Sequence, residues 1–338
     1  MPSGRPPLRE LGLEALIIRD GAPALDGIAL GLPHRPMTRV AFPAHNGLSS
    51  GLGIRRLGFD ARLAELLDAD PRVRFCQRVE VRDVARDDHG SILQTSEGEL
   101  RARFAVIADG LRSPLRHRFG WTVGPKPPHR YGIIAHWQRD GLVDSWVRIT
   151  FDDGLEVYDG PVEGGQRMVG LLCYQGRMRE FAGRLGERYR EVVLGLRPEL
   201  SESTQIDAPV AIGPFMYRAS TVAQRGVFLV GDAAGFSDPI TGEGIAAALR
   251  QAQALALALE SPYPERDYRR AHRRITRDPR RIAVLMLYLS RTPALVERGL
   301  RSHQRAPQML SKLLGIGFGY WGFNRITPRE WVRIFTGR

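Results

Sequence analysis

The segment spanning residues 226–249 constrains the fold of this chain more than any other feature. It begins with an apolar run at 227–230 and continues through a glycine-rich polar turn that carries Asp232. Residues 245–259 are then almost all Ala, Leu, Gln and Arg. A short, continuous apolar run is typical of a strand covered on both faces, and the later composition favours a helix. The sequence therefore predicts a strand, a tight turn and a helix in direct succession.

This turn has the chemistry of a ligand-binding loop. Asp232 lies where the strand ends, so its carboxylate emerges at the carboxyl edge of a sheet, which is the usual ligand side of open α/β folds. The start of the following helix presents free N–H groups and partial positive charge to an anion or an electron-rich ring. The residues expected to line or stiffen the turn are Gly231, Pro239, Gly242, Gly244 and Ile245.

A second segment repeats part of this pattern. The apolar run at 104–108 leads directly into Asp109 and Gly110, and Ser113 and Arg116 follow at the start of a predicted helix. An aspartate accepts hydrogen bonds from sugar hydroxyls, and an arginine holds a phosphate with two parallel hydrogen bonds. We therefore expect both aspartates at one sheet edge, with Arg116 as a phosphate ligand.

Together, the two segments resemble the two internal fingerprints of FAD-dependent oxidoreductases in the aromatic-hydroxylase and geranylgeranyl-reductase superfamily. Arg56, four residues before Asp60, matches the FAD-contacting arginine of that superfamily. The resemblance covers about residues 5–260. It implies that Asp232 binds the ribityl chain or the adjacent phosphate of FAD and that Asp109 and Gly110 line the same groove. It also implies that Gly242 and Gly244 open the helix that points at the flavin ring.

The resemblance implies a monooxygenase or a C=C reductase that acts on an apolar small molecule or a lipid-like substrate, with NAD(P)H as the candidate electron donor. The order Asp-Pro-Ile-Thr-Gly-Glu-Gly at 238–244 is closer to the reductase-like branch than to the phenol hydroxylases. No catalytic residue is assigned, because the flavin supplies most of the chemistry in such enzymes. Two alternatives stay open: a non-enzymatic remnant without flavin, and a flavin halogenase-like enzyme.

One departure from the superfamily is large. Its members begin with a strand, a G-x-G-x-x-G turn and a helix that hold the FAD pyrophosphate. The match in this chain, at 317–322, follows a helical pattern rather than a strand and is interpreted as coincidental. We expect about 45–50 residues, one βαβ unit and a loop, to be absent before Met1. A mis-assigned start codon or a truncated gene explains such an absence.

The fold class that follows is α/β: an incomplete Rossmann-like FAD-binding domain, an inserted antiparallel β-sheet substrate domain and a helical C-terminal tail. The expected domains are 1–118 and 210–261 for FAD, 119–209 for the substrate and 262–338 for a basic helical region. The sequence favours one helix over 5–19, a loop-rich stretch to Gly53, a helix at 59–67, and strands over 73–84 and 91–100. Aromatic and histidine side chains on the predicted substrate sheet are interpreted as packing residues rather than catalysts: Tyr131, His136, Trp137, Trp146 and Tyr158.

The net positive charge of the chain arises in its last quarter. The net charge is +12, and residues 261–338 hold 17 Arg and Lys against 5 Asp and Glu. A solvated helical face is the favoured interpretation, and peripheral contact with a membrane or capping of an apolar pocket is the alternative. Nucleic-acid binding is not expected, because no aromatic stacking platform or reading helix accompanies the charge. Two cysteines without metal-ligand spacing and the absence of a signal peptide favour a cytoplasmic protein without a metal.

Overall fold

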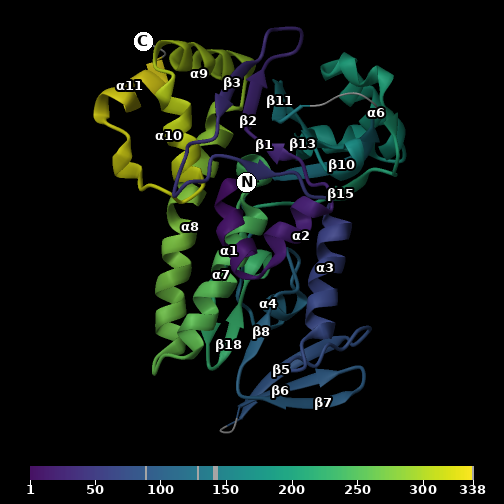
Figure 1. Cartoon of the computed structure of the whole chain (residues 1–338), viewed down its shortest axis with the longest axis vertical. Helices are drawn as coiled ribbons and strands as arrows, with labels where there is room; N and C mark the ends of the chain where they lie inside the picture. The colour runs from purple at the N-terminus through teal and green to yellow at the C-terminus, as the bar shows by residue number, and fades with distance from the viewer. Residues whose placement is uncertain (88–89, 128, 140–143, 337–338) are drawn as a thin grey trace.

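The structure is a computed structural model that describes residues 1–87, 90–127, 129–139 and 144–336. Figure 1 shows an elongated molecule, with the largest sheet and the C-terminal helices at one end and a small antiparallel sheet at the other. The helices α7 (Gly244–Leu259) and α8 (Pro264–Leu289) run lengthwise between these ends, side by side. The fold is α/β, as the sequence predicts.

The two segments with aspartate turns form a parallel pair of strands. The strand β8 (Ala105–Ile107) pairs with β18 (Val227–Leu229), and β17 (Ala223–Gln224) adds an antiparallel strand on the far side of β18. All three residues of β18 are fully buried, as its apolar run predicts. The helix α7 follows in sequence, so the predicted strand, turn and helix are confirmed.

A larger sheet of eight strands lies at the opposite end of α7. Four of its strands confirm the alternating runs predicted between residues 131 and 174, and α6 (Leu185–Leu196) packs on one face through Tyr189. The indole N–H of Trp137 donates to the Tyr189 hydroxyl across this contact. The strands, in spatial order, are β14 (Thr204–Gln205), β10 (Arg130–Gln138), β13 (Gln166–Tyr174), β12 (Leu155–Pro161), β11 (Trp146–Asp152), β2 (Gly27–Gly31) and β3 (Thr38–Ala41), with β15 (Val210–Ile212) on β10.

Two of these strands come from a stretch that we expected to be loop-rich, and that prediction was wrong. The strand β2 pairs in parallel with β11 and antiparallel with β3. Glycines at both of its ends make it look like a loop in the sequence, yet the first is required by packing: a Cβ on Gly27 would lie 2.3 Å from the Val40 carbonyl oxygen. The predicted domain limits stay predictions, although β2 and β3 join the large sheet from within the first predicted domain.

Two further sequence predictions need correction. The expected helix over 5–19 is two helices, α1 (Arg5–Glu10) and α2 (Leu13–Arg19), because Gly12 adopts a φ of 71° between them. The expected strand over 73–84 begins only at residue 81, because the chain turns just before it, where Arg78 adopts a φ of 59°. The small sheet at the lower end of Figure 1 is made of β5 (Val81–Asp87), β6 (Gly90–Thr95) and β7 (Gly98–Ala102).

The C-terminal region is helical, as predicted. After α8 it contains α9 (Pro293–Arg305), α10 (Gln308–Gly317) and α11 (Pro328–Thr336). The Gly317–Gly322 match follows α10 and not a strand, as expected. In the part of the chain described here, none of the helices has the length and apolar character needed to cross a membrane.

Several further elements lie around the two aspartate turns and the loop before α7. They are α3 (Arg56–Ala69), α4 (Pro114–Arg118), β9 (Thr122–Val123), β16 (Tyr217–Ala219), β19 (Gly235–Phe236) and the short helix η6 (Pro239–Thr241).

Candidate FAD-binding site

The parallel register brings the two aspartate turns to the same sheet edge. Leu229 lies opposite Ile107, and the N–H of Val230 donates to the Ile107 carbonyl at 3.0 Å. Asp109 and Asp232 therefore follow neighbouring strands that end together, as the sequence predicts. Gly110 and Gly231 have φ angles of 86° and 64°, a region that favours glycine, so both turns depend on these residues.

Arg116 does not fit the predicted phosphate-binding role. Its side chain is 1% exposed. One guanidinium nitrogen donates to the carbonyl oxygens of Asp232 at 3.2 Å and Ala233 at 2.9 Å, and the other donates to Leu111 at 2.7 Å. These hydrogen bonds connect the Asp109 turn to the Asp232 turn on their buried side. Because its donors are engaged by buried carbonyls, Arg116 positions the two turns and is not presented to a phosphate.

Ser113 is also a buried residue that supports the Asp109 turn. Its side chain is fully buried, and its hydroxyl oxygen accepts from the N–H of Arg116 at 3.1 Å. It is the N-cap of α4, which starts after it as the sequence predicts. Ser113 therefore fixes the helix that carries Arg116.

Asp232 is the half-buried acceptor of the site. Burial raises the pKa of its carboxyl group, while the positive charges of Arg56 and Arg116 lower it. Arg56 is exposed at the start of α3 and forms an ion pair with Asp60 at 2.9 Å. Asp109 is exposed on the neighbouring turn. Arg56 thus acts on the charge of Asp232, and Arg116 interacts with the charges of both Asp109 and Asp232, although these residues are far apart in sequence.

The loop between Asp232 and α7 turns sharply twice. The Asp238 carboxylate caps η6 by accepting from the N–H of Ile240 at 3.0 Å, and Gly242 ends it with a φ of 65°. A Cβ on Gly242 would lie 2.6 Å from the Met1 side chain, so this turn packs tightly on the N-terminal segment. Gly244 begins α7, and the next side chain, Ile245, is 39% exposed. The first turn of α7 therefore reaches the molecular surface.

A buried charge cluster, which the sequence analysis did not identify, holds this loop against the large sheet. Arg130 lies 2.9 Å from Glu156 and 3.4 Å from Asp238, and these side chains are at most 4% exposed. The hydroxyls of Tyr158 and Ser290 donate to Glu156 at 3.0 and 2.8 Å. Burial raises the pKa of Asp238 to about 6, against the pull of Arg130. The position of Asp238 directly before Pro239 was the one available sequence signal.

The other aromatic and histidine candidates on the sheet have structural partners, as interpreted from the sequence. Trp137 is fully buried, and His136 binds Asp207 through its ring at 2.7 Å. Trp146 lies under the guanidinium of Arg39, 5.4 Å from ring centre to carbon. Tyr131 packs against the core beneath α6. Tyr158 alone of the five joins the charge cluster beside the loop.

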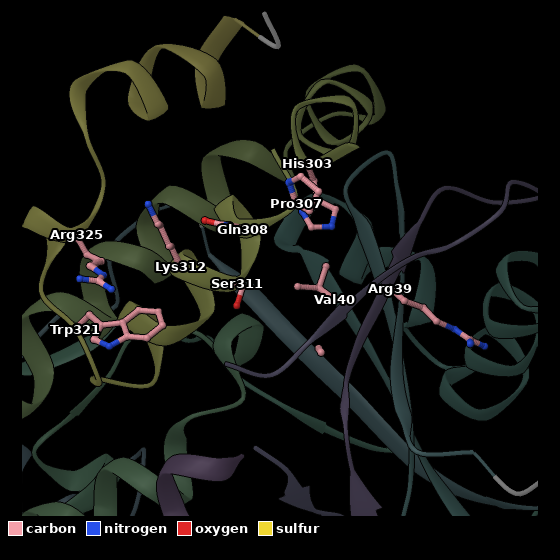
Figure 2. A pocket seen from close by; sticks show the side chains of 10 residues that line it. Arg39, Val40, His303, Pro307, Gln308, Ser311, Lys312, Trp321 and Arg325 are labelled. Carbon is pink, nitrogen blue, oxygen red and sulfur yellow. The ribbon is translucent and has the colours of Figure 1, made fainter. Parts of the chain in front are cut away.

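Two cavities accompany these elements. The larger, about 1020 Å³, lies between α7, α8 and the strands β16 and β19; Gly231, Asp232, Asp238 and Gly244 are part of its wall. We call it the α7–α8 cavity. The smaller, about 490 Å³, lies between β3 and the helices α9 and α10, and Figure 2 shows its lining side chains, among them Lys312 and Trp321. The larger cavity adjoins the aspartate turn, so it is the one relevant to a cofactor site.

The residues present fit one half of an FAD molecule. Asp232 offers a half-buried acceptor to hydroxyls, Arg56 offers an exposed cation, and Gly244 offers the N–H end of a long helix. Among the described residues, no G-x-G-x-x-G turn follows a strand, so the usual pyrophosphate cradle is not among them. The fit therefore concerns the ribityl and flavin parts of the cofactor.

Comparison with known proteins agrees with this geometry. Squalene monooxygenase of Rattus norvegicus is 25% identical over 260 residues, which are 74% of this chain and 45% of that protein. Menaquinone reductase of Mycobacterium tuberculosis is 26% identical over 237 residues, 66% of this chain and 57% of that protein. The chain thus spans about half the length of these curated relatives. A solved flavoprotein/dehydrogenase from Cytophaga hutchinsonii has the same fold, with a TM-score of 0.81 at 19% identity, covering 95% of this chain and 82% of that one. The FAD binding domain family matches residues 7–287, and the chain belongs to that family.

Proposed function

We propose that the chain is an FAD-dependent oxidoreductase, of the monooxygenase or C=C reductase type, that acts on an apolar, lipid-like molecule. The observation that carries this proposal is the pairing of the Asp109 and Asp232 turns at one sheet edge, locked by Arg116 and next to a cavity of about 1020 Å³. The relatives named above are named for squalene and menaquinone, which are apolar molecules. Bound FAD supplies the redox chemistry in such an enzyme.

The residues of this chain then bind and orient. Asp232 accepts hydrogen bonds from ribityl hydroxyls, and Asp109 with Gly110 lines the same groove. Arg56, exposed and paired with Asp60, would offer a cation to the phosphate next to the ribityl chain. The N-terminal turn of α7, from Gly244 and Ile245, stabilises negative charge on the ring by about 0.3–2 kcal/mol. Gly231, Pro239 and Gly242 shape the backbone around these groups.

Flavin content of the purified protein tests the proposal. We expect a yellow protein with near-stoichiometric FAD, and we expect Asp232→Ala to lose most of it, since a buried acceptor for hydroxyls is removed. Asp68→Ala is the matched control, because Asp68 is an exposed aspartate on α3 away from the turns. A colourless wild-type protein that takes up no added FAD would overturn the proposal.

The reaction type and electron donor need a second measurement. We propose NADPH or NADH as the donor, and a monooxygenase would couple its oxidation to oxygen uptake, whereas a reductase would proceed without oxygen. Conversion of the organic substrate with the donor under nitrogen and under air separates the two, because only a monooxygenase needs oxygen to form its product. The 238–244 loop favours the reductase type and departs from the flavin-halogenase pattern, which remains the less supported flavin chemistry.

A second candidate is a chain without flavin. The outer edge of β8 has no strand partner in the described part of the chain, and Val106 on that strand is 48% exposed. An unpaired edge with apolar surface favours association over a defined cofactor site. The flavin content of the purified protein also tests this candidate. A colourless protein that aggregates would support it.

We propose that the basic C-terminal helices contact a membrane surface from the cytoplasmic side. On α11, Val332 is 59% exposed between the exposed Arg329 and Arg333. An apolar side chain flanked by cations suits the interface of an anionic bilayer. Co-sedimentation with vesicles containing phosphatidylserine tests this, comparing the wild type with Arg329→Gln/Arg333→Gln. Equal partitioning of the two proteins contradicts the proposal.

A further inference from the structure

The α7–α8 cavity has a strongly basic wall. Six arginines from β16 and α8 line it, and three of them have acidic partners outside the cavity lining. Arg277 and Arg281 pair with Asp278 at 3.0 and 3.2 Å, and Arg269 lies 3.6 Å from Glu265. The remaining three are Arg218, Arg273 and Arg280.

Arg218 and Arg280 are the two half-buried cations of this group, and in the described chain neither makes an ion pair or a side-chain hydrogen bond. Burial lowers the pKa of Arg280, and the positive charge of Arg218 lowers it further, so the two guanidinium groups repel each other. Taking charged groups partly out of water without a counterion costs free energy. An anion that accepts hydrogen bonds from both guanidinium groups would offset this cost.

The carboxylates of the same wall do not supply that anion. Asp238 lies 3.4 Å from Arg130, and Glu243 lies 3.1 Å from Arg250. Asp232 faces Arg56 and Arg116, whose charges lower the pKa of its carboxyl group against the effect of burial. Asp238 and Glu243 are thus paired with cations other than Arg218 or Arg280, and in the described chain no ion pair joins Asp232 to either of these two arginines. The positive charge of the pair is left for a molecule from outside.

The cavity becomes apolar along the next turns of α8. Residues four apart share one face of a helix, and Arg280, Val284 and Tyr288 follow that spacing along the cavity wall. Val284 is 51% exposed and Tyr288 48% exposed in the structure. Further apolar lining comes from Leu285, Phe323 and Trp331. One face of α8 therefore changes from cationic to apolar within the same cavity.

We propose that the α7–α8 cavity binds an anionic amphiphile, with its phosphate or carboxylate oxygens between Arg218 and Arg280 and its apolar chain along Val284 and Tyr288. The claim that this amphiphile is the substrate rests on the proposed function. The claim that the cavity binds it rests only on the residues of the cavity wall. It narrows the substrate class from apolar molecules in general to those with an acidic end.

Binding of dodecyl phosphate, below its micelle concentration, tests the site by calorimetry on the full chain. We expect dodecyl phosphate to bind at least about tenfold more tightly than dodecanol, which has the same chain without the charge. Arg218→Gln/Arg280→Gln should reduce the affinity for dodecyl phosphate to that of dodecanol. Arg274→Gln is the matched control, because Arg274 is exposed on α8 and outside the cavity lining.

Three results would overturn the proposal. Equal binding of dodecanol and dodecyl phosphate would remove the role of the charge, and equal binding of inorganic phosphate would remove the role of the chain. An equal loss in Arg274→Gln would reduce the effect to the general basic charge of the helix. The melting temperature of each variant confirms that it folds, and Val284→Asp offers an independent variant that should weaken dodecyl phosphate binding without removing either arginine.

Flavin content, measured on the same proteins, separates this inference from the proposed function. We expect Arg218→Gln/Arg280→Gln to keep the wild-type level of FAD, because neither arginine belongs to the aspartate turns. A loss of FAD with unchanged dodecyl phosphate binding would assign the arginines to the cofactor and overturn the inference. A wild type that binds dodecyl phosphate but no FAD would overturn the proposed function and leave the anion site standing.

Discussion

Two buried arginines hold the candidate site from opposite ends, and their surroundings differ. Arg116, under the aspartate turns, and Arg130, under the Asp238 loop, are each 1% exposed. Arg116 donates to three neutral carbonyl oxygens, whereas Arg130 faces the carboxylates of Glu156 and Asp238. Among the described residues, the Nε and one Nη of Arg130, and one oxygen of Asp238, have no hydrogen-bond partner.

This difference separates a permanent brace from a charge-dependent one. Carbonyl oxygens do not titrate, so the contacts of Arg116 are the same at any pH at which the protein is folded. The contacts of Arg130 depend on whether Asp238 is ionised, and burial raises the pKa of Asp238 to about 6. We infer that the sheet-edge end of the site is rigid and that the loop end is sensitive to protonation.

Replacing Arg116 should produce the largest effect. Arg116→Met removes the donors of three buried carbonyl groups and should lower the free energy of unfolding by about 3–5 kcal/mol at every pH. Denaturant titrations at pH 5 and pH 7 measure this. Arg118→Met is the control on the same helix, since Arg118 is 59% exposed and should change stability by less than about 0.5 kcal/mol. A small loss for Arg116→Met would show that the two turns hold together without it.

Replacing Arg130 should cost less at low pH than at neutral pH. Arg130→Met leaves Glu156 and Asp238 buried as like charges, so we expect a loss of about 2–4 kcal/mol at pH 7. At pH 5 Asp238 binds a proton, one of these charges disappears, and the loss should be smaller. The same titrations measure the difference. An equal loss of stability at pH 5 and pH 7 would show that the contribution of Arg130, like that of Arg116, does not depend on pH.

The pH dependence due to Asp238 itself has a defined sign. A carboxyl group with a raised pKa keeps its proton in the folded chain while the unfolded chain has already released it. Its contribution to stability is therefore greatest below about pH 4 and falls as the pH rises to about 6, by about 3 kcal/mol in total. Asp238→Asn should remove this slope. Subtracting the variant's stability from that of the wild type, at each pH, isolates the residue from other titrating groups, and a flat difference contradicts the prediction.

The sequence predicted the first of these regions much better than the second. Asp109, Gly110, Gly231 and Asp232 stand in contiguous runs whose strand and turn chemistry is local, so their meeting follows from a parallel pair of strands. The role of Arg116 was misjudged because its residue type is equally suited to a phosphate and to buried carbonyls, and burial decides between them.

The Arg130 cluster joins residues from β10, β12, the Asp238 loop and the end of α8, and no local pattern records such distant pairing. The same holds for Arg218 on β16 and Arg280 on α8, which line one cavity. The strand β2 was missed for a different reason: Gly27 is required by the close approach of the Val40 carbonyl, and in a sequence glycines indicate a loop. Periodicity reports on one element at a time, and these features belong to several.

The smallest expected effect concerns the edge of the charge cluster. The Tyr158 hydroxyl donates to Glu156 at 3.0 Å, so Tyr158→Phe removes one hydrogen bond to a buried carboxylate and leaves the ring in place. We expect a loss of about 1–2 kcal/mol in the free energy of unfolding. Tyr263→Phe, on a tyrosine that is 59% exposed, is the control and should change it by less than about 0.5 kcal/mol. If Tyr158→Phe left the free energy of unfolding unchanged, the hydrogen bonds of Arg130 and Ser290 to Glu156 would be sufficient, and the Tyr158 hydroxyl would not stabilise the cluster.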